Sequence, residues 1–155
     1  MEIRIAKRTD IPELRRLLLQ VGGVHHDIRP DIFRNGCLKY TDQELAELLL
    51  DETRPVWAAM EGDTMLGYCF CIFQQHLNNN ILTDIRTLYI DDLCVDENCR
   101  GQHIGSKLYA YVLDFARQSG CYNVTLNVWS CNKSALAFYE KLGLKSQKVG
   151  METIL

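Results

Sequence analysis

The chain has 155 residues, a length that suits one domain with a buried core and leaves no room for a second catalytic domain. Its formal net charge of −3 gives no positive field of the kind that nucleic acid or an anionic membrane requires of a partner. No apolar run reaches the length of a membrane span, and residues 1–5 lack the apolar core of a signal peptide, so we expect a single cytoplasmic domain over residues 1–155.

The first elements in chain order are a short strand and a helix. Residues 2–6 alternate charged and apolar side chains, as a strand at a sheet edge does. Thr9-Asp10-Ile11-Pro12 then supplies a cap with proline in the first helical turn. An apolar stripe follows at helical spacing, and we expect the helix to end at Gly22-Gly23, because adjacent glycines disfavour a helix interior.

Residues 22–40 form the longest irregular stretch of the pattern. His25 and His26 suggest a metal site or a base, but neighbouring residues on a helix do not share a face, so a solvated junction is the better interpretation. Irregular segments of this length in compact domains usually carry function. We therefore expect a lid over the acceptor substrate, with His26, Arg29 and Asp31 as its substrate-binding residues.

A second helix and a series of strands come next. Thr41 and Glu44 form a capping box that opens a helix before Pro55. Residues 56–60 and 65–73 are apolar runs joined by a glycine-containing turn, the pattern of an antiparallel hairpin. Another strand lies within residues 82–95 and contains Asp91-Asp92. Since successive side chains of a strand alternate, we expect these carboxylates on opposite faces.

The remaining residues alternate between helices and strands. Residues 104–119 predict a third helix, residues 124–129 a strand, and residues 135–142 a fourth helix, each helix ended by a glycine. Residues 144–155 predict a final strand or hairpin. A hairpin series followed by alternating helices and strands indicates an α/β fold with a mixed sheet and helices on both faces.

Most of the seven cysteines are expected to be buried thiols. Their number is odd, and they lack the dense spacing of cysteines that is typical of small domains stabilised by disulfides. Cys94, Cys99 and His103 are the one group that suggests a metal, but there is no C-x-x-C spacing and no evident fourth ligand. We therefore expect no metal.

The stretch from the apolar strand to the third helix predicts a phosphate site. A strand that ends at Val95 and leads through a loop with Gly101 into a helix leaves backbone N–H groups unpaired, where the helix dipole favours an anion. The spacings of the nucleotide-hydrolysing loop and of the dinucleotide fingerprint are both absent.

The residues Arg100-Gly101-Gln102-His103-Ile104-Gly105 resemble the pyrophosphate loop of the GCN5-related N-acetyltransferases. The family pattern is Arg or Gln, two residues, Gly, one residue, then Gly or Ala. This chain departs from it at His103, which stands at the first glycine. Histidine is among the few other residues enriched at positive φ, so the loop can still form.

A second signature of the same family lies in residues 132–144. The pattern N-x-x-A-x-x-F-Y-x-x-x-G-F/L is matched at every marked position, although a Phe-Tyr pair alone is more often core packing. The two signatures stand in the family's order, and the resemblance covers essentially the whole chain. It implies the acyl-CoA N-acyltransferase fold, with a central sheet of about six to seven strands and four helices on both faces.

The resemblance also implies a reaction. Acetyl-CoA is the cosubstrate, a neutral primary amine attacks the thioester directly, no metal takes part, and Tyr139 protonates the leaving thiolate. Ile90-Asp91-Asp92-Leu93 resembles an I-E-D-F stretch of polyamine-type relatives, which makes Asp91 the first choice for the base. The residues implied in binding acetyl-CoA are Leu93, Cys94, Val95, Arg100, Gly101, Gln102, His103, Ile104, Gly105, Ser106, Asn127 and Asn132.

Three questions stay open at this point. The chain is either an enzyme or a non-catalytic acyl-CoA-binding regulatory module. Tyr139 favours the enzyme, because a regulatory module needs no proton donor at the sulfur. His103 favours the module, because a distorted loop would weaken cofactor binding. Asp91 either accepts a proton or only forms a structural pair. The acceptor is a small-molecule amine or a peptide, and a homodimer is among the expected assemblies because dimers are common in the family.

Overall fold

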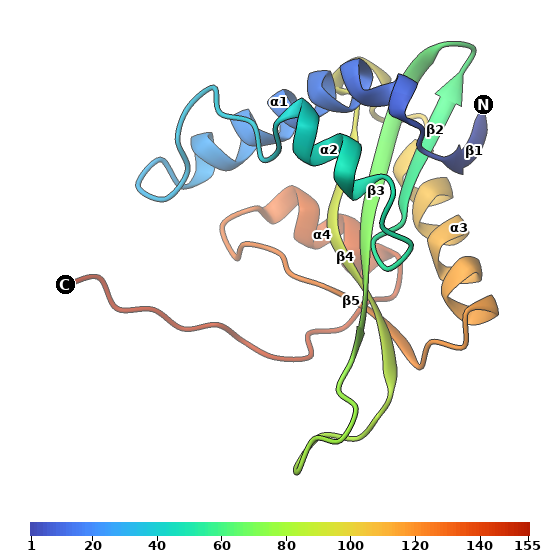
Figure 1. The fold of residues 1–155 in the computed structure, drawn as a ribbon. Helices are drawn as coiled ribbons and strands as arrows, with labels where there is room; N and C mark the ends of the chain where they lie inside the picture. Colours follow the sequence, from blue (N-terminus) through green and yellow to red (C-terminus); the bar gives the residue numbers. More distant parts are fainter.

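One mixed sheet with the strand order β1-β2-β3-β4-β5 runs through the molecule (Figure 1). The computed structural model describes all of residues 1–155. Strands β1 to β4 pair antiparallel, and β5 lies parallel to β4. The mixed α/β class is confirmed, with five strands where six to seven were expected. The strands are β1 (Glu2–Ile5), β2 (Val56–Glu61), β3 (Thr64–Gln75), β4 (Arg86–Val95) and β5 (Asn123–Leu126).

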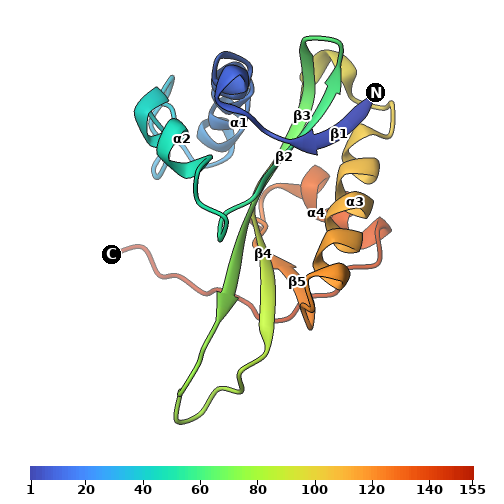
Figure 2. The same cartoon turned by 45° about the vertical axis from the view of Figure 1, so that its right-hand side comes forward.

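Helices cover both faces of the sheet, as expected (Figure 2). On one face, α1 (Ile11–Ile28) and α2 (Asp42–Leu48) pack over a cluster that includes Leu17 and Tyr68. On the other, α3 (Ile104–Gln118) packs its Leu108 side chain into a cluster with Leu88 and Ile90, with α4 (Lys133–Lys141) beside it. Short 3-10 turns, η1 (Arg8–Asp10) and η2 (Glu97–Cys99), precede α1 and follow β4. None of the helices combines the length and apolar character needed to cross a bilayer.

The local signals for α2 and for the hairpin are confirmed. Thr41 accepts a hydrogen bond from the Glu44 N–H, and the Glu44 carboxylate accepts one from the Thr41 N–H at 2.7 Å, which is the predicted capping box. Strands β2 and β3 are joined by a tight turn in which Gly62 has a φ of 59°, a conformation that suits glycine.

Helix α1 continues through Gly22 and Gly23 to Ile28, so the prediction that it ends at this glycine pair is wrong. The reason is a long-range contact. A Cβ atom on Gly22 would lie 3.1 Å from the carbonyl oxygen of Cys37, so glycine lets the segment after the helix approach closely. A helical glycine costs only about 1 kcal/mol relative to alanine, which this packing outweighs. His25 and His26 therefore lie on a helix and not in a junction.

The C-terminal region also differs from the prediction. Strand β5 ends at Leu126, short of Trp129, and residues 143–155 form neither a strand nor a hairpin. The apolar side chains of Val149, Met151 and Ile154 are 76%, 88% and 80% exposed. Since no layer covers them, the apolar alternation that predicted a strand has no partner strand within the chain. The segment passes β4 and β5, where Gln147 and Lys148 border a hollow, and its C-terminal end lies away from the sheet (Figure 1).

A charged cluster ties α1 to the end of β4. Arg16 donates hydrogen bonds to Asp96, to Glu13 at 2.9 Å and to the carbonyl oxygen of Met65 at 2.8 Å. The Asp96 side chain is 7% exposed and also accepts from the Asn98 N–H at 3.0 Å. Burial raises the pKa of Asp96, but the hydrogen bonds from Asn98 and Arg16 outweigh it and hold the pKa below 3.8.

We predict that Asp96→Asn lowers the free energy of unfolding at pH 7 by about 1–3 kcal/mol, because Arg16 loses a nearly buried charged partner. The folded-state pKa of Asp96 is lowered, so its contribution is present above pH 3.8 and is lost as the pH falls through the folded value. Urea denaturation at neutral and acidic pH measures both effects. The control is Asp114→Asn, whose pair with Arg117 is exposed and whose effect should stay within about 0.5 kcal/mol. Equal effects of the two substitutions would contradict the prediction.

Candidate functional site

The sheet opens where β4 and β5 part. Their parallel pairing runs from Thr87 and Asn123 to Ile90 and Leu126, where β5 ends. Strand β4 continues to Val95 with β3 as its only neighbour. Ladder bonds of an antiparallel pair alternate along the strand. Because Asp96 N–H donates to the Leu66 carbonyl of the β3 side, this alternation points the backbone groups of Leu93 and Val95 toward the open edge.

Unpaired amides at the start of α3 lie directly after this edge. The first helical hydrogen bond runs from the Lys107 N–H to the His103 carbonyl at 3.0 Å, so the N–H groups of Ile104, Gly105 and Ser106 have no acceptor within the helix. The first turn holds no acidic side chain, and no side chain caps it. This helix start therefore offers donors and a positive dipole end to an anion.

The loop before α3 reaches this geometry through two left-handed residues. Gly101 has a φ of 79°, and His103 has φ 60° and ψ 17°. The departure from the family pattern thus occurs at a position that does require positive φ, and histidine adopts it. The loop keeps the shape that glycine would give, at a conformational cost on the order of 1 kcal/mol.

Gly105 brings the two sequence signatures into contact. A Cβ atom at this position would lie 3.1 Å from Cζ of Phe138 and 3.4 Å from Cγ2 of Val95. The first turn of α3 therefore packs directly on α4 and on the last residue of β4. Any larger side chain would separate the start of α3 from both.

A β-bulge in β4 places the two adjacent carboxylates. Asp92 pairs with Phe70, and Ile90 pairs with Cys71, so Asp91 is an extra residue with no partner of its own in β3. The expectation that Asp91 and Asp92 face opposite sides is wrong, because the extra residue turns both toward α1 and α2. A bulge also bends its strand, and this one follows directly after the last pair with β5.

Asp91 is held by two residues of the segment between α1 and α2. The Lys39 ammonium lies 2.7 Å from its Oδ2 atom, and the Tyr40 hydroxyl donates to the same oxygen at 3.2 Å. The Tyr40 ring stacks on Phe70 with 5.7 Å between centroids. The Asp91 side chain is 19% exposed, so the ion pair sits at the rim of the core.

Asp92 is the second carboxylate of the pair, and Asp91 was the first choice for the base. Its Oδ2 atom accepts a hydrogen bond of 2.9 Å from the hydroxyl of Tyr68, a fully buried residue. Burial raises the pKa of Asp92, although Lys39 and the Tyr68 hydrogen bond act in the opposite direction. A partly desolvated carboxylate with a raised pKa is a better proton acceptor than an exposed one. Its position on the Asp91 side follows from the bulge, which the sequence does not reveal.

Tyr139 approaches from the other face of the sheet. It lies on α4, with its ring 6.5 Å from that of Tyr109, and its hydroxyl makes no hydrogen bond within the chain. Burial, followed by the charges of Cys69 and Asp92, raises the pKa of Tyr139 above 10. The hydroxyl is therefore protonated at neutral pH.

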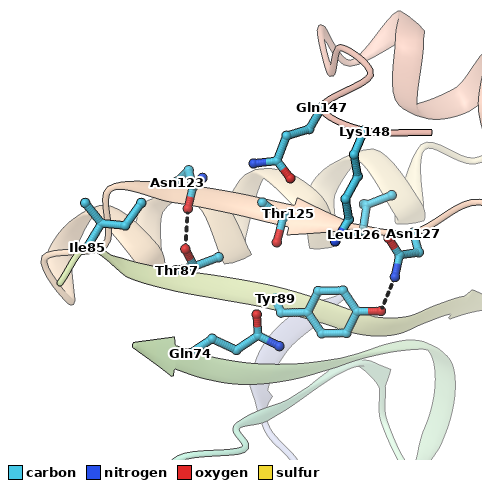
Figure 3. A pocket seen from close by; sticks show the side chains of 10 residues that line it. All are labelled: Gln74, Ile85, Thr87, Tyr89, Asn123, Thr125, Leu126, Asn127, Gln147 and Lys148. Carbon is cyan, nitrogen blue, oxygen red and sulfur yellow. Dashed lines mark hydrogen bonds between the residues drawn. The ribbon is translucent and has the colours of Figure 1, made fainter. Parts of the chain in front are cut away.

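Asn132 and Asn127 differ in which of their side-chain atoms form hydrogen bonds within the chain. Oδ1 of Asn132 caps α4, accepting from the Ala135 N–H at 3.2 Å and from the Ser134 hydroxyl at 3.0 Å, and its Nδ2 group makes no hydrogen bond within the chain. Asn127 donates through Nδ2 to the Tyr89 hydroxyl at 3.1 Å. Asn127 borders a hollow of about 420 Å³ over the paired halves of β4 and β5, which Gln147 and Lys148 close from the C-terminal segment (Figure 3).

The three residues predicted to bind the acceptor make hydrogen bonds and ion pairs within their own segment and with the C-terminal segment. His26 Nδ1 lies 2.8 Å from the carbonyl oxygen of Phe33, just beyond the end of α1. Arg29 pairs with Asp31 at 2.8 Å and with Glu152 at 2.6 Å. The structure thus joins Arg29 to Asp31 and to the C-terminal segment, and His26 to Phe33; none of the three makes a hydrogen bond to Asp91 or Tyr139.

The cysteine and histidine group near the loop is not gathered around one point. Cys94 is buried, and its Sγ atom lies 3.7 Å from the Leu17 carbonyl. Burial, with Asp92 as the next contribution, raises the pKa of the Cys94 thiol to about 12, so it remains protonated. No group of three His, Cys, Asp or Glu side chains is placed to hold one metal ion.

Comparison with known proteins gives a consistent result. Residues 24–144 match the model of the acetyltransferase (GNAT) family. A thialysine N-epsilon-acetyltransferase from Bos taurus is 40% identical over 134 residues, which are 86% of this chain and 72% of that protein. A glucosamine 6-phosphate N-acetyltransferase from Arabidopsis thaliana is 33% identical over 63 residues, which are 41% of this chain and only 40% of that protein. A crystal structure of a mutant BH1408 protein from Bacillus halodurans superposes with a TM-score of 0.95 at 30% identity, covering 100% of this chain and 99% of the other.

Proposed function

Because the chain belongs to the GNAT acetyltransferase family, we propose that it transfers the acetyl group of acetyl-CoA to a primary amine. The observation that carries the proposal is the open edge of β4 beside the unpaired amides of α3. Release of coenzyme A in the presence of a panel of amines tests it. If acetyl-CoA binds and no amine accelerates the release, only a non-catalytic binding module remains.

The backbone supplies most of the donor site in this proposal. The pantetheine arm carries amide groups, which can pair with the free N–H and C=O groups of Leu93 and Val95 as an added strand would. The pyrophosphate is placed on the amides of residues 102–106, with Arg100 nearby as a cation. The free Nδ2 group of Asn132 is available to the arm from the α4 side, and that of Asn127 once it leaves Tyr89.

Gly105→Val should weaken acetyl-CoA binding more than tenfold, or about 1.4 kcal/mol, because the new side chain meets Phe138 and shifts the amides at the start of α3. Isothermal calorimetry measures the Kd, and circular dichroism checks the fold. Gly105→Ala, with a smaller side chain, should give an intermediate loss. The control is Gly150→Val, since a Cβ atom there meets nothing within 4 Å. Unchanged affinity in folded Gly105→Val would refute this placement.

Proton transfer is assigned to groups on both sides of the opening. The acceptor must lose a proton to become a nucleophile, and Asp91 takes it in this proposal. Asp92 adds a second negative charge that attracts a cationic acceptor. Tyr139 is protonated at neutral pH and donates to the sulfur as the carbon–sulfur bond breaks.

Tyr139→Phe should lower kcat by about 10²-fold and leave the Kd for acetyl-CoA unchanged, because only the proton donor is removed. Since the pKa of Tyr139 is raised, the wild-type rate should fall only at high pH, where the hydroxyl ionises, and the variant should not show this fall. Steady-state kinetics across the pH range measure both. The control is Tyr122→Phe, at a residue that is 74% exposed. A wild-type kcat in Tyr139→Phe at every pH would remove the assigned role.

The acceptor is proposed to enter past residues 24–40, the segment whose end holds Asp91. The name of the bovine relative specifies the ε-amine of thialysine. For this chain we propose a small cationic amine or a peptide amine, since the carboxylates of Asp91 and Asp92 lie on the side of the sheet that this segment covers. His26, Arg29 and Asp31 then act by fixing the shape of the segment, through the contacts that join it to Phe33 and Glu152.

Arg29→Ala should raise the KM for the acceptor by roughly threefold to tenfold while the Kd for acetyl-CoA stays constant, because the segment loses its anchor to Asp31 and Glu152. Acceptor titrations with coenzyme A release as the readout measure this. Arg15→Ala, which removes an exposed pair with Asp42, is the matched control. A change confined to the binding of acetyl-CoA, or no change, would show that the segment does not serve the acceptor.

A further inference from the structure

A lysine of the chain itself occupies the position in which the base would meet an acceptor. The Lys39 ammonium lies 2.7 Å from the carboxylate of Asp91, and its side chain remains 40% exposed. Lys39 is the one lysine of the chain that forms an ion pair. An arginine supplies the cation in every other ion pair between side chains. A primary amine is thus already in contact with the proposed proton acceptor.

The residues on either side of Lys39 hold its backbone in place. Leu38 and Tyr40 both pack against the core cluster under α1 and α2. The Tyr40 hydroxyl also accepts a hydrogen bond of 3.2 Å from Arg54, and its ring stacks on Phe70. The amine therefore reaches Asp91 from a fixed point of the chain, which makes the contact a property of the fold and not of a freely moving side chain.

We propose that Lys39 is a self-acetylation site, modified by the same donor and the same acid–base groups as an external amine. The proposal rests on the proposed function. Its physical basis is proximity: an amine held beside the base reacts within one molecule, and such arrangements gain greatly over reaction between molecules. Burial opposes the charge of Lys39, but Asp91 and Asp92 outweigh it and raise the pKa, so the amine is charged at rest and needs the base.

The reaction balances without any further reagent. Asp91 takes one proton from the Lys39 ammonium, and the free electron pair of the nitrogen forms the amide bond with the acetyl carbonyl carbon. The carbon–sulfur bond breaks, and the thiolate leaves with a proton from Tyr139. The second nitrogen proton returns to Tyr139 through solvent, and the proton on Asp91 passes to solvent. The products are N-ε-acetyl-Lys39, coenzyme A and one proton.

Acetylation would change the acceptor site itself. The neutral amide of acetyl-Lys39 no longer pairs with Asp91, so a carboxylate that was neutralised within the chain becomes free for an external cation. In the unmodified protein, an incoming amine has to displace Lys39. The modification therefore removes an internal competitor and is expected to lower the KM for cationic amines.

The test is incubation of the purified full chain with acetyl-CoA and no added amine, followed by peptide mass spectrometry. Lys39 should gain an acetyl group at least about tenfold faster than the exposed Lys145, as expected for a reaction within one molecule. The rate should not depend on protein concentration. Tyr139→Phe and heat-denatured protein should both lose this preference, and Lys39→Arg should show no fast site. Lys145→Arg is the matched control and should behave as the wild type.

The outcomes separate this inference from the proposed function. Coenzyme A release with the amine panel is measured on the same samples. Release with amines but no preferential acetylation of Lys39 overturns the self-acetylation site and leaves the enzyme intact. Equal rates of acetylation at Lys39 and Lys145, or a rate at Lys39 that Tyr139→Phe does not change, would show non-enzymatic acetylation. Either result also overturns the self-acetylation site. No release with any amine and no acetyl-Lys39 overturns both.

Discussion

The parting of β4 and β5 after Ile90 and Leu126 is the constraint on which the candidate site depends. A strand inside a domain normally pairs on both sides, because unpaired N–H and C=O groups away from water cost free energy. Here the free edge of β4 ends at a helix start that also has unpaired amides. The two sets of donors follow one another along the chain, so one extended ligand with amide groups and an anionic end can satisfy both.

In the proposed reaction, groups on opposite faces of the sheet act together at this opening. Asp91 and Asp92 lie on the side of α1 and α2, whereas Tyr139 comes from α4 on the side of α3. A continuous sheet would separate them. Where the strands part, the negative charge of Asp92 reaches Tyr139 and contributes to its raised pKa. In the proposed reaction, the proton acceptor and the proton donor therefore come from two different layers of the fold.

Features set by local chemistry could be predicted from the sequence, and features set by distant contacts could not. The capping box at Thr41 and the helix after the loop both follow from short-range patterns, whereas the contact between the two signatures at Gly105 is long-range. The passage of α1 through Gly22 depends on the Cys37 carbonyl, fifteen positions away. The bulge depends on the register of β4 with β3. The pairing of Lys39 with Asp91 depends on the bulge and on the path of the chain after α1. The site's carboxylates were therefore identified, but their shared face was not.

A single extra residue distinguishes the bulged strand β4 from a regular strand. Asp91 is the surplus residue of β4: without it, Ile90 and Asp92 would be neighbours opposite Cys71 and Phe70, and every other pair with β3 would keep its present face. The strand would then lack the bend that follows its last pair with β5. One residue thus supplies both the bend and a carboxylate directly after the last pair with β5, and the proposed reaction draws on that carboxylate.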